Sequence, residues 1–220
     1  MNKIDYCSFN WLILKINNQV FQAQRPNLKG RVIDLGCGSG QYKDAILATA
    51  HEYIGVDWPC SLHENRNIDV FADLNKRLPF DDNYADVIVS FQVMEHLAEP
   101  SFFLSECSRI LRSGCPLIIT VPFMWHVHEA PHDYFRFTRY GLEYMLQQAG
   151  FSNISITENT GFWQMMVLKF NYHTLRFARG PLKLIWIPVW WFGQVVSPLL
   201  DRLDKHPEET ASYTVTARKT

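Results

Sequence analysis

The 220-residue sequence predicts an α/β fold, and two observations carry that prediction. Residues 32–42, VIDLGCGSGQY, begin with a β-branched apolar pair, pass through three glycines spaced two apart and enter a helical pattern. Further along the chain, short apolar runs typical of buried strands alternate with segments of helical periodicity. A strand, a glycine turn and a helix in this order are typical of a nucleoside- or dinucleotide-binding unit, because the backbone there must approach a ligand closely.

The elements expected along the chain follow from these periodicities. A leading helix over residues 8–23 and a linker to residue 30 come before the first strand. Strands are expected at residues 32–35, 53–56, 68–73, 84–91, 116–121 and 152–158, and helices at 42–50, 100–112 and from a Thr138 cap to Gly150. We divide the chain into an N-terminal helix and linker (1–29), a ligand-binding domain (30–160 plus 210–220) and an apolar insertion (161–209).

Composition narrows the classes of partner. The length suits one α/β domain with an insertion. The 21 basic and 22 acidic residues give a net charge of -1, so we expect no nucleic-acid partner. Five cysteines without zinc spacing, Cys60 among them, favour reduced thiols in the cytoplasm. The apolar run at residues 11–16 is short and broken by Lys15, so we expect no signal peptide.

The glycine spacing separates two kinds of nucleoside-binding loop. A GxGxxG fingerprint of hydride-transfer enzymes would place its last glycine at position 41, which is Gln41. The GxGxG loop, Asp57, the Asp73–Leu74 pair and the later segment LPFDDNYADVIVSFQVMEHL resemble, in order and spacing, the class I S-adenosylmethionine-dependent methyltransferases of the type-11-like group. The resemblance implies a Rossmann-like, seven-stranded mixed sheet with helices on both faces. Residues 211–218 alternate as its antiparallel seventh strand should, between strands five and six.

The expected cofactor is therefore S-adenosylmethionine. Asp57 lies 21 residues after Gly36, the separation at which a carboxylate can accept both ribose hydroxyls, although it could also be a solvated strand-end acid. By resemblance, Asp73 meets the adenine amine; otherwise it caps the turn before Asn75. In the related enzymes the leading helix often lies over the cofactor, but it can instead pack on the sheet edge. The expected cofactor-binding residues are Asp34, Gly36, Cys37, Gly38, Gly40, Asp57, Asp73, Leu74, Ser90 and Phe91.

Residues 123–138, FMWHVHEAPHDYFRFT, follow the carboxyl end of a central strand, where the acceptor substrate should lie. Metal binding is disfavoured and no metal is expected, since Pro131 breaks a helical His128–His132 face and no third ligand is identifiable. We expect acceptor recognition, with His128, His132 or Asp133 as proton acceptor and Arg136 as anchor for an anionic group. A purely structural loop is the alternative. His96, Trp125 and His126 are the further expected substrate-binding residues.

The insertion contains residues 182–200, LKLIWIPVWWFGQVVSPLL, with the single charge Lys183. Its length approaches a membrane span, but one crossing would separate strand seven from its sheet, and Pro188 and Pro198 weaken a continuous helix. Two interpretations remain. The insertion packs on the body as a lid, acceptor-pocket wall or homodimer contact, or it dips into a membrane interface. Three tryptophans and three basic residues would suit the second: Trp186, Trp190, Trp191, Arg176, Arg179 and Lys183.

The resemblance implies methyl transfer to a hydroxyl or other heteroatom of a small molecule, saccharide or lipid-linked saccharide, in bacterial surface-polysaccharide or lipid biosynthesis. We expect a cytoplasmic protein, with the inner membrane face as the alternative location. Two other function classes stay open. One is a non-catalytic nucleoside-binding protein of the same fold, and the other is an NAD-dependent oxidoreductase, which Gln41 disfavours.

Overall fold

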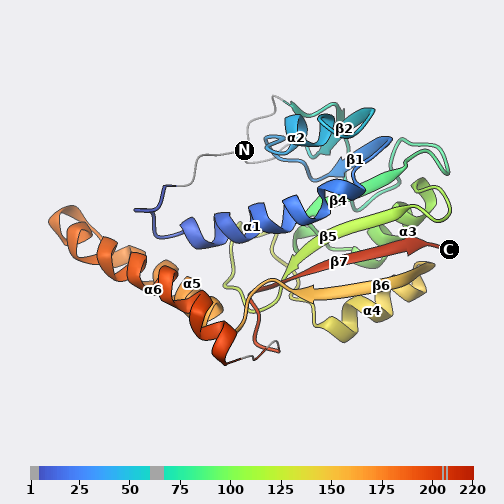
Figure 1. Cartoon of the computed structure of the whole chain (residues 1–220). Helices are drawn as coiled ribbons and strands as arrows, with labels where there is room; N and C mark the ends of the chain where they lie inside the picture. The colour runs from blue at the N-terminus through green and yellow to red at the C-terminus, as the bar shows by residue number, and fades with distance from the viewer. Residues whose placement is uncertain (1–4, 60–66, 205, 207) are drawn as a thin grey trace.

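A single seven-stranded sheet with the order β3-β2-β1-β4-β5-β7-β6 forms the centre of the molecule (Figure 1). The computed structural model describes residues 5–59, 67–204, 206 and 208–220. β7 runs antiparallel to both β5 and β6, while the other pairs are parallel, which confirms the predicted topology. The strands are β1 (Arg31–Leu35), β2 (Glu52–Asp57), β3 (Val70–Phe71), β4 (Val87–Phe91), β5 (Pro116–Pro122), β6 (Phe151–Glu158) and β7 (Ser212–Lys219).

Helices cover both faces of the sheet because alternate strand residues point to opposite sides. Ile33 and Ile88 face a core shared with α3 and α4, whereas Val32 and Val87 face a second core shared with α1 and α2. The helices are α1 (Trp11–Gln24), α2 (Lys43–Leu47), α3 (Pro100–Ile110), α4 (Arg139–Gln148), α5 (Phe162–Thr174) and α6 (Lys183–Leu203). Short 3₁₀ turns are η1 (Arg25–Asn27), η3 (Met94–His96), η4 (Leu175–Phe177) and η5 (Gly180–Leu182).

Several boundaries differ from the sequence expectation. α2 keeps only five residues of the expected 42–50 helix, and β3 keeps two of the expected six-residue strand. An edge strand pairs on one side only, so few backbone bonds extend it. Thr138 caps α4 as expected, since its Oγ1 accepts a hydrogen bond from the Gly141 amide at 3.1 Å. Cys60 lies outside the described residues, and the other four cysteines are free thiols.

The leading helix α1 packs on the protein body along its whole length. Its C-terminal half buries Phe21, which stacks on Tyr42 with 4.3 Å between ring centroids. Its N-terminal half buries Trp11 and Leu12 in a cluster with Met165 of α5. α1 therefore joins the sheet to the insertion, in line with the packing alternative for this helix.

The insertion forms an antiparallel helical hairpin, α5 and α6, that projects from the sheet (Figure 1). The two prolines expected to weaken a continuous helix do not interrupt it, because α6 runs through Pro188 and Pro198 as one 21-residue helix. Each proline removes one backbone hydrogen bond. Packing against α5 compensates, with Trp190 and Gln194 buried on the inner side of α6.

Residues Gly180–Leu203 form the one described helix that is long and apolar enough to cross a membrane, by length and composition alone. The chain after α6 returns to the sheet, where β7 pairs with both β5 and β6. Both ends of the hairpin therefore meet the same domain. A single crossing by α6 would separate β7 from the sheet that it completes.

Candidate active site

A cavity of about 740 Å³ opens at the carboxyl ends of the parallel strands. The glycine turn after β1, the acid that ends β2 and the segments after β3 and β4 line one side. The loop after β5 lines the other. Among the described residues, the lining consists of Gly36, Cys37, Gly38, Ser39, Gln41, Asp57, Trp58, Asp73, Leu74, Asn75, Phe91, Gln92, Val93, His96, Leu97, Glu129, Ala130, Pro131, His132 and Tyr134.

The glycine turn brings the backbone to the cavity. Gly36 has a φ of +78°, and a Cβ at this position would stand 2.3 Å from a methyl carbon of Val93. Any side chain would therefore both strain the turn and push into the segment that follows β4. The Gly36 and Cys37 amides donate to the Val56 carbonyl at 2.8 and 3.1 Å, which fixes the turn against β2.

Asp57 stands at the end of β2 and holds the turn from the other side. Its Oδ2 accepts a hydrogen bond from the Gly38 amide at 2.5 Å, and its Oδ1 accepts one from the Trp58 amide at 2.6 Å. A carboxylate offers about four acceptor positions, so each oxygen can still accept a hydroxyl from the cavity. This geometry suits the two hydroxyls of a ribose.

Asp73 and Leu74 line the neighbouring part of the cavity. Asp73 also caps its own turn, because its Oδ1 accepts from the backbone and side-chain nitrogens of Asn75, each at 3.0 Å. Partial burial opposes ionisation, but the hydrogen bonds from Asn75 and Lys76 hold the pKa of Asp73 below its usual value. The two sequence alternatives for Asp73, ligand contact and turn cap, are therefore compatible.

Three expected cofactor residues lie behind the cavity wall. Asp34 is buried, accepts a hydrogen bond from the Tyr53 hydroxyl at 2.9 Å, and has a pKa raised to about 7 by burial. Ser90 donates to the Leu35 carbonyl at 2.7 Å, and Gly40 packs against Asn67. These residues support the turn and the strand ends, and none of them is among the described lining residues.

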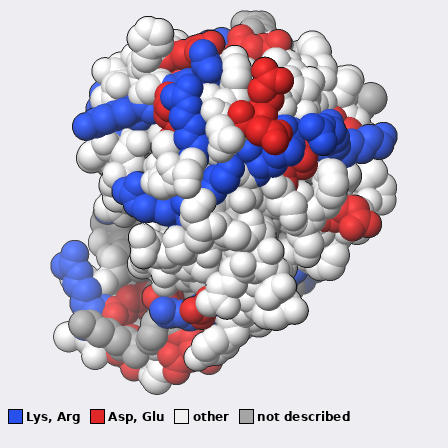
Figure 2. All heavy atoms as spheres, turned by 90° about the vertical axis from the view of Figure 1, so that its right-hand side faces the viewer, with Lys and Arg blue, Asp and Glu red and all other residues white. Residues whose placement is uncertain are grey.

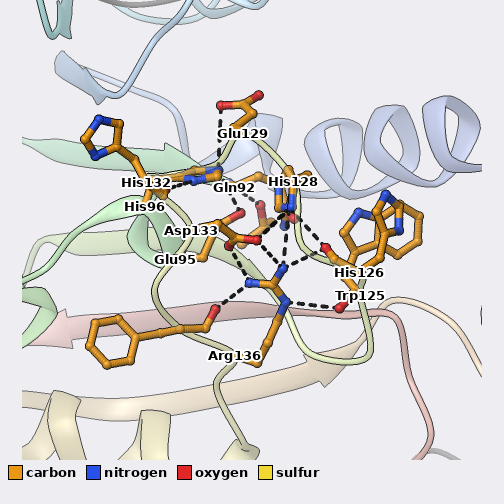
Figure 3. Close-up of polar contacts among 12 residues, drawn as sticks. Gln92, Glu95, His96, Trp125, His126, His128, Glu129, His132, Asp133 and Arg136 are labelled. Atoms are coloured by element: carbon orange, nitrogen blue, oxygen red, sulfur yellow. Dashed lines mark hydrogen bonds and ion pairs between the residues drawn. The ribbon is translucent and has the colours of Figure 1, made fainter.

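The opposite wall of the cavity comes from η3 and from residues 123–138, named the histidine loop below. His96, Glu129 and His132 line the cavity, and His132 packs edge-on against Trp58 with ring centroids 5.2 Å apart. Figure 3 shows His96 next to Glu95, with Glu129 above them and His128 to their right. His128 and Trp125 line a smaller adjoining cavity of about 130 Å³.

The structure assigns Asp133 and Arg136 a different place from the expected one. The Asp133 side chain is only 1% exposed and accepts two hydrogen bonds from Arg136, at 2.6 and 2.7 Å. Arg136 also donates to the carbonyls of Trp125, His126 and Phe135 (Figure 3). Its guanidinium is thus engaged inside the loop instead of facing the cavity as an anion anchor. The hydrogen bonds from Arg136 lower the pKa of Asp133, so this carboxylate is a poor proton acceptor.

His126 and Trp125 lie on the outer side of the loop. Both rings pack against Tyr172 of α5, with centroids 5.1 Å away in each case. Of the residues expected to bind the acceptor, only His96 and His132 lie in the large cavity. Trp125 and His126 instead connect the histidine loop to the hairpin.

Comparison with known proteins shows which family the sheet domain resembles. A family model described as Methyltransferase domain (Methyltransf_11) matches residues 33–119. A probable S-adenosylmethionine-dependent methyltransferase of Mycolicibacterium smegmatis is 35% identical over 109 residues, which are 47% of this chain and 42% of that protein. Residues 33–119 thus match a class I S-adenosylmethionine-dependent methyltransferase domain. The matched residues span about two fifths of the length of these curated relatives.

Other relatives share the methyltransferase fold. The ubiquinone biosynthesis O-methyltransferase of Hahella chejuensis is 24% identical over 138 residues, covering 58% of this chain and 56% of that one. A methyltransferase structure from Archaeoglobus fulgidus superposes with a TM-score of 0.63 at 18% identity, over 94% of both chains. Phosphoethanolamine N-methyltransferase 2 of Haemonchus contortus, solved with S-adenosylmethionine, gives 0.61 at 16% identity, over 96% of this chain and 56% of that one.

The cavity has the features that S-adenosylmethionine requires. The glycine turn leaves space beside the backbone, and Asp57 offers free acceptor positions at the end of β2. Leu74 and Phe91 supply apolar surface for a base, with the Asp73 carboxylate at its edge. The methyltransferase domain can therefore hold the cofactor with residues from the ends of four neighbouring strands.

Several lining residues escaped the sequence analysis. Trp58 follows Asp57 directly, so its position at a strand end could have indicated a cavity residue. Gln92, by contrast, lies at the cavity mouth as its place after a strand end predicts, and its φ of +56° marks a backbone conformation that non-glycine residues rarely adopt. Glu129 and Tyr134 were hidden within the histidine loop, because a loop carries no periodicity that would show which side chains face inward.

Proposed function

We propose that the protein transfers a methyl group from S-adenosylmethionine to a hydroxyl oxygen, or another heteroatom, of a small-molecule, saccharide or lipid-linked acceptor. The observation that carries this proposal is the single cavity, which has Asp57 and the glycine turn on one wall and His96 and His132 on the other. Bound S-adenosylmethionine would supply an activated methyl group on a sulfonium sulfur. Since that methyl needs little further activation, the protein contributes chiefly by alignment, worth up to roughly 7 to 11 kcal/mol.

The residues of the second wall can accept the proton that a hydroxyl acceptor loses. His132 lines the cavity, and its Nδ1 lies 3.2 Å from the Tyr134 hydroxyl, which also lines it. His128 lies behind His96 as seen from the cavity. The ring centroids of these two histidines are 4.9 Å apart. Trp58 and Tyr134 also line the cavity, so their rings would partly shield a bound acceptor from water.

A direct assay tests the proposal. We expect labelled methyl from S-adenosylmethionine to enter an acceptor in a bacterial extract and S-adenosylhomocysteine to raise the melting temperature of the protein. NAD should leave the melting temperature unchanged. Stabilisation by NAD instead would support an oxidoreductase. Stabilisation by S-adenosylhomocysteine without transfer to any acceptor class would support a non-catalytic nucleoside-binding protein.

The hairpin α5–α6 favours an acceptor at a lipid surface. Its outer face exposes large apolar side chains, with exposed fractions of 75% for Leu184 and 63% for Phe192. Other exposed members of this face are Phe170, Phe177, Leu182, Ile185, Val189, Trp191, Val195, Leu199 and Leu203. A contiguous apolar face of this kind marks an interaction surface, because isolated exposed residues are common but such runs are rare.

The charged residues of the hairpin indicate which kind of surface it would bind. Residues 159–200 contain no Asp or Glu, but four Lys and Arg residues: Lys169, Arg176, Arg179 and Lys183. The last three flank the turn between α5 and α6, at the end of the hairpin far from the sheet (Figure 1). On the face turned away from the hairpin, basic and acidic side chains are interspersed (Figure 2). Apolar surface with basic residues alone is complementary to an anionic membrane interface.

The hairpin also adjoins the acceptor wall. Tyr172 of α5 packs against Trp125 and His126 of the histidine loop, and buried Gln194 of α6 accepts a hydrogen bond from the Leu12 amide at 3.0 Å. A hairpin bound to the inner membrane face would therefore hold the cavity close to lipid-linked molecules. We propose an anionic lipid surface as its partner.

Liposome sedimentation tests this surface. We expect the protein to bind phosphatidylglycerol-containing vesicles and to bind pure phosphatidylcholine at least tenfold more weakly. Leu184→Glu combined with Phe192→Glu should abolish binding. Tyr140→Glu, at a 78% exposed aromatic residue on α4, is the matched control and should bind normally. A concentration-dependent dimer that the double substitution dissociates, without any vesicle binding, would show that a second copy covers the hairpin.

A further inference from the structure

Glu95 in η3 is a buried carboxylate without a hydrogen-bond partner. Its side chain is 0% exposed, and neither carboxylate oxygen meets a hydrogen-bond donor among the described residues. The other buried carboxylates have partners: Asp34 accepts from Tyr53, and Glu106 accepts from Arg109 and from the Leu78 amide. A buried acid left in this state is destabilising, so its presence calls for an explanation such as a bound ion.

His96, the next residue in the chain, turns a free nitrogen towards Glu95. Its Nδ1 lies 2.5 Å from the carbonyl oxygen of His132, and a carbonyl can only accept, so Nδ1 carries the proton. In the neutral imidazole, Nε2 is then the nitrogen without a proton. It lies 3.8 Å from Oε1 of Glu95 and 3.9 Å from Oε2 of Glu129. A backbone carbonyl that orients the distal nitrogen of an imidazole is the usual arrangement for a metal-binding histidine.

His128 approaches the same point from the histidine loop. Its Nδ1 lies 3.3 Å from the His126 carbonyl, 3.4 Å from Oδ2 of Asp133 and 3.4 Å from Nη2 of Arg136. Both protons of that Arg136 nitrogen already serve the His126 carbonyl and Asp133, at 2.8 and 2.7 Å. His128 Nδ1 therefore acts as the donor, which leaves its Nε2 free as well.

We propose that Glu95, His96 and His128 bind a divalent first-row transition-metal ion such as Zn²⁺ or Mn²⁺. The ligand atoms that these three side chains offer lie within 4.8 Å of one another. Metal bonds of about 2.0–2.2 Å place neighbouring ligands roughly 3–4 Å apart, so side-chain shifts of about 1 Å complete the site. Two imidazoles and one carboxylate match these ions better than Ca²⁺ or Mg²⁺, which prefer oxygen ligands.

The structure thereby supplies the third ligand that the sequence did not reveal. In the sequence, the spacing of four residues pairs His128 with His132. The fold instead brings His128 beside the Glu95–His96 pair, 32 residues earlier in the chain, and leaves His132 on the cavity wall. Asp133 and Arg136 then serve to hold the histidine loop in place and to orient His128.

The ion would stand between the two cavities. His96 lines the large cavity and His128 the small one, and Gln92 lines both. This role rests on the proposed function: an acceptor hydroxyl that coordinates the ion loses its proton more readily, as metal-bound water does. The oxygen would give that proton to His132 on the same wall and form its new bond to carbon as the carbon–sulfur bond breaks, with the electron pair left on sulfur.

Metal binding can be measured on the whole chain without cofactor or acceptor. After chelator treatment, we expect calorimetry with Zn²⁺ alone to give one site per chain. Co²⁺ should give visible absorption bands typical of nitrogen ligation. His96→Ala, His128→Ala and Glu95→Gln should each weaken Zn²⁺ binding at least tenfold. His132→Ala, which changes a histidine of the same loop but keeps the backbone carbonyl, is the matched control and should bind normally.

Folding of each variant is checked by its thermal shift with S-adenosylhomocysteine, which depends on the other wall of the cavity. Glu95→Gln is decisive because it keeps the volume and removes only the charge. Zn²⁺ affinity that is unchanged in Glu95→Gln or in His128→Ala would overturn the proposal. Metal binding without methyl transfer would leave the site standing and refute only the proposed function.

Discussion

Asp133 and Arg136 form an ion pair with two hydrogen bonds, and this pair joins two parts of the histidine loop. The carboxylate accepts from two guanidinium nitrogens at 2.6 and 2.7 Å, and its Oδ2 also accepts from the His128 amide at 2.8 Å. Fork-to-fork geometry of this kind is stronger and more specific than a single contact. The pair therefore sets the shape of the histidine loop, which carries His128 and His132.

Asp133→Asn should loosen this wall. The substitution leaves the partly buried Arg136 guanidinium without its counter-charge, and we expect a loss of about 1–3 kcal/mol in the free energy of unfolding. Turnover should fall more than cofactor affinity, because Asp57 and the glycine turn lie on the opposite wall. Urea unfolding and calorimetry with S-adenosylhomocysteine measure the two effects.

Arg139→Ala is the control for Asp133→Asn. Arg139 pairs with Glu158 at 3.1 Å, but the arginine side chain is 51% exposed. An exposed pair contributes about 0–1 kcal/mol, so this variant should change stability and turnover little. Equal effects of the two substitutions would contradict a special role for the Asp133–Arg136 pair.

Asp57→Asn should weaken cofactor binding. The carboxylate holds the glycine turn through the Gly38 amide and is placed to accept ribose hydroxyls. Hydrogen bonds to a charged group contribute about 1.5–3 kcal/mol, so affinity for S-adenosylhomocysteine should fall by roughly 10- to 100-fold. Calorimetry gives this value. Asp81→Asn, at an exposed acid away from the cavity lining, should bind as the unaltered protein does, and unchanged affinity in Asp57→Asn would remove the ribose assignment.

The sequence predicted the donor half of the site well because that half is local. The turn from Gly36 to Gly40 and Asp57 lie at the ends of β1 and β2, which fall within one residue of the expected ends at 35 and 56. The seven-stranded topology followed from the order of the motifs, and β7 pairs as expected with β5 and β6. Even here, Asp34 and Ser90 proved to support the wall from behind instead of lining the cavity.

The positions of the side chains in the acceptor half of the site could not be predicted in the same way. Residues 123–138 have no regular secondary structure after β5, so side-chain direction there depends on tertiary contacts. Arg136 could have pointed into the cavity or into the loop, and four hydrogen-bond acceptors inside the loop decide the matter: Trp125, His126, Asp133 and Phe135. Likewise, the meeting of Glu95 with His128 depends on the approach of two distant segments, which no spacing rule encodes.

Asp34→Asn should change how stability depends on pH. Burial raises the pKa of Asp34 from its usual 3.8 to about 7, so the folded protein holds this proton more tightly than the unfolded chain. Stability contributed by the protonated group is complete below pH 4, and falls by about 1.4 kcal/mol per pH unit until it levels off above pH 7. The difference in unfolding free energy between Asp34→Asn and the unaltered protein should therefore grow from pH 4 to pH 7 in favour of the variant.

Tyr53→Phe is the companion variant for this pH effect. The Tyr53 hydroxyl donates to Asp34 at 2.9 Å and favours the carboxylate, so its removal should raise the pKa of Asp34 further. The fall in stability would then extend to higher pH than in the unaltered protein. Urea midpoints between pH 5 and pH 8.5 follow this shift. If stability depends on pH in the same way in Asp34→Asn and in the unaltered protein, the pKa of Asp34 is not raised.

Asp201→Ala should weaken the hairpin at its base. Asp201 lies near the end of α6, yet its carboxylate accepts from the amides of Gly161, Trp163 and Gln164 at 3.0, 2.8 and 3.2 Å. It therefore caps the start of α5, where no intrahelical acceptor exists, and loss of such a cap costs about 0.5–2 kcal/mol. Hydrogen exchange of the first α5 amides should accelerate. Asp204→Ala removes the 3.0 Å bond from Trp163 Nε1 and the ion pair with His206, but no bond to an α5 amide, so it should leave that exchange nearly unchanged. Equal acceleration in both variants would show that α6 stabilises α5 by packing alone.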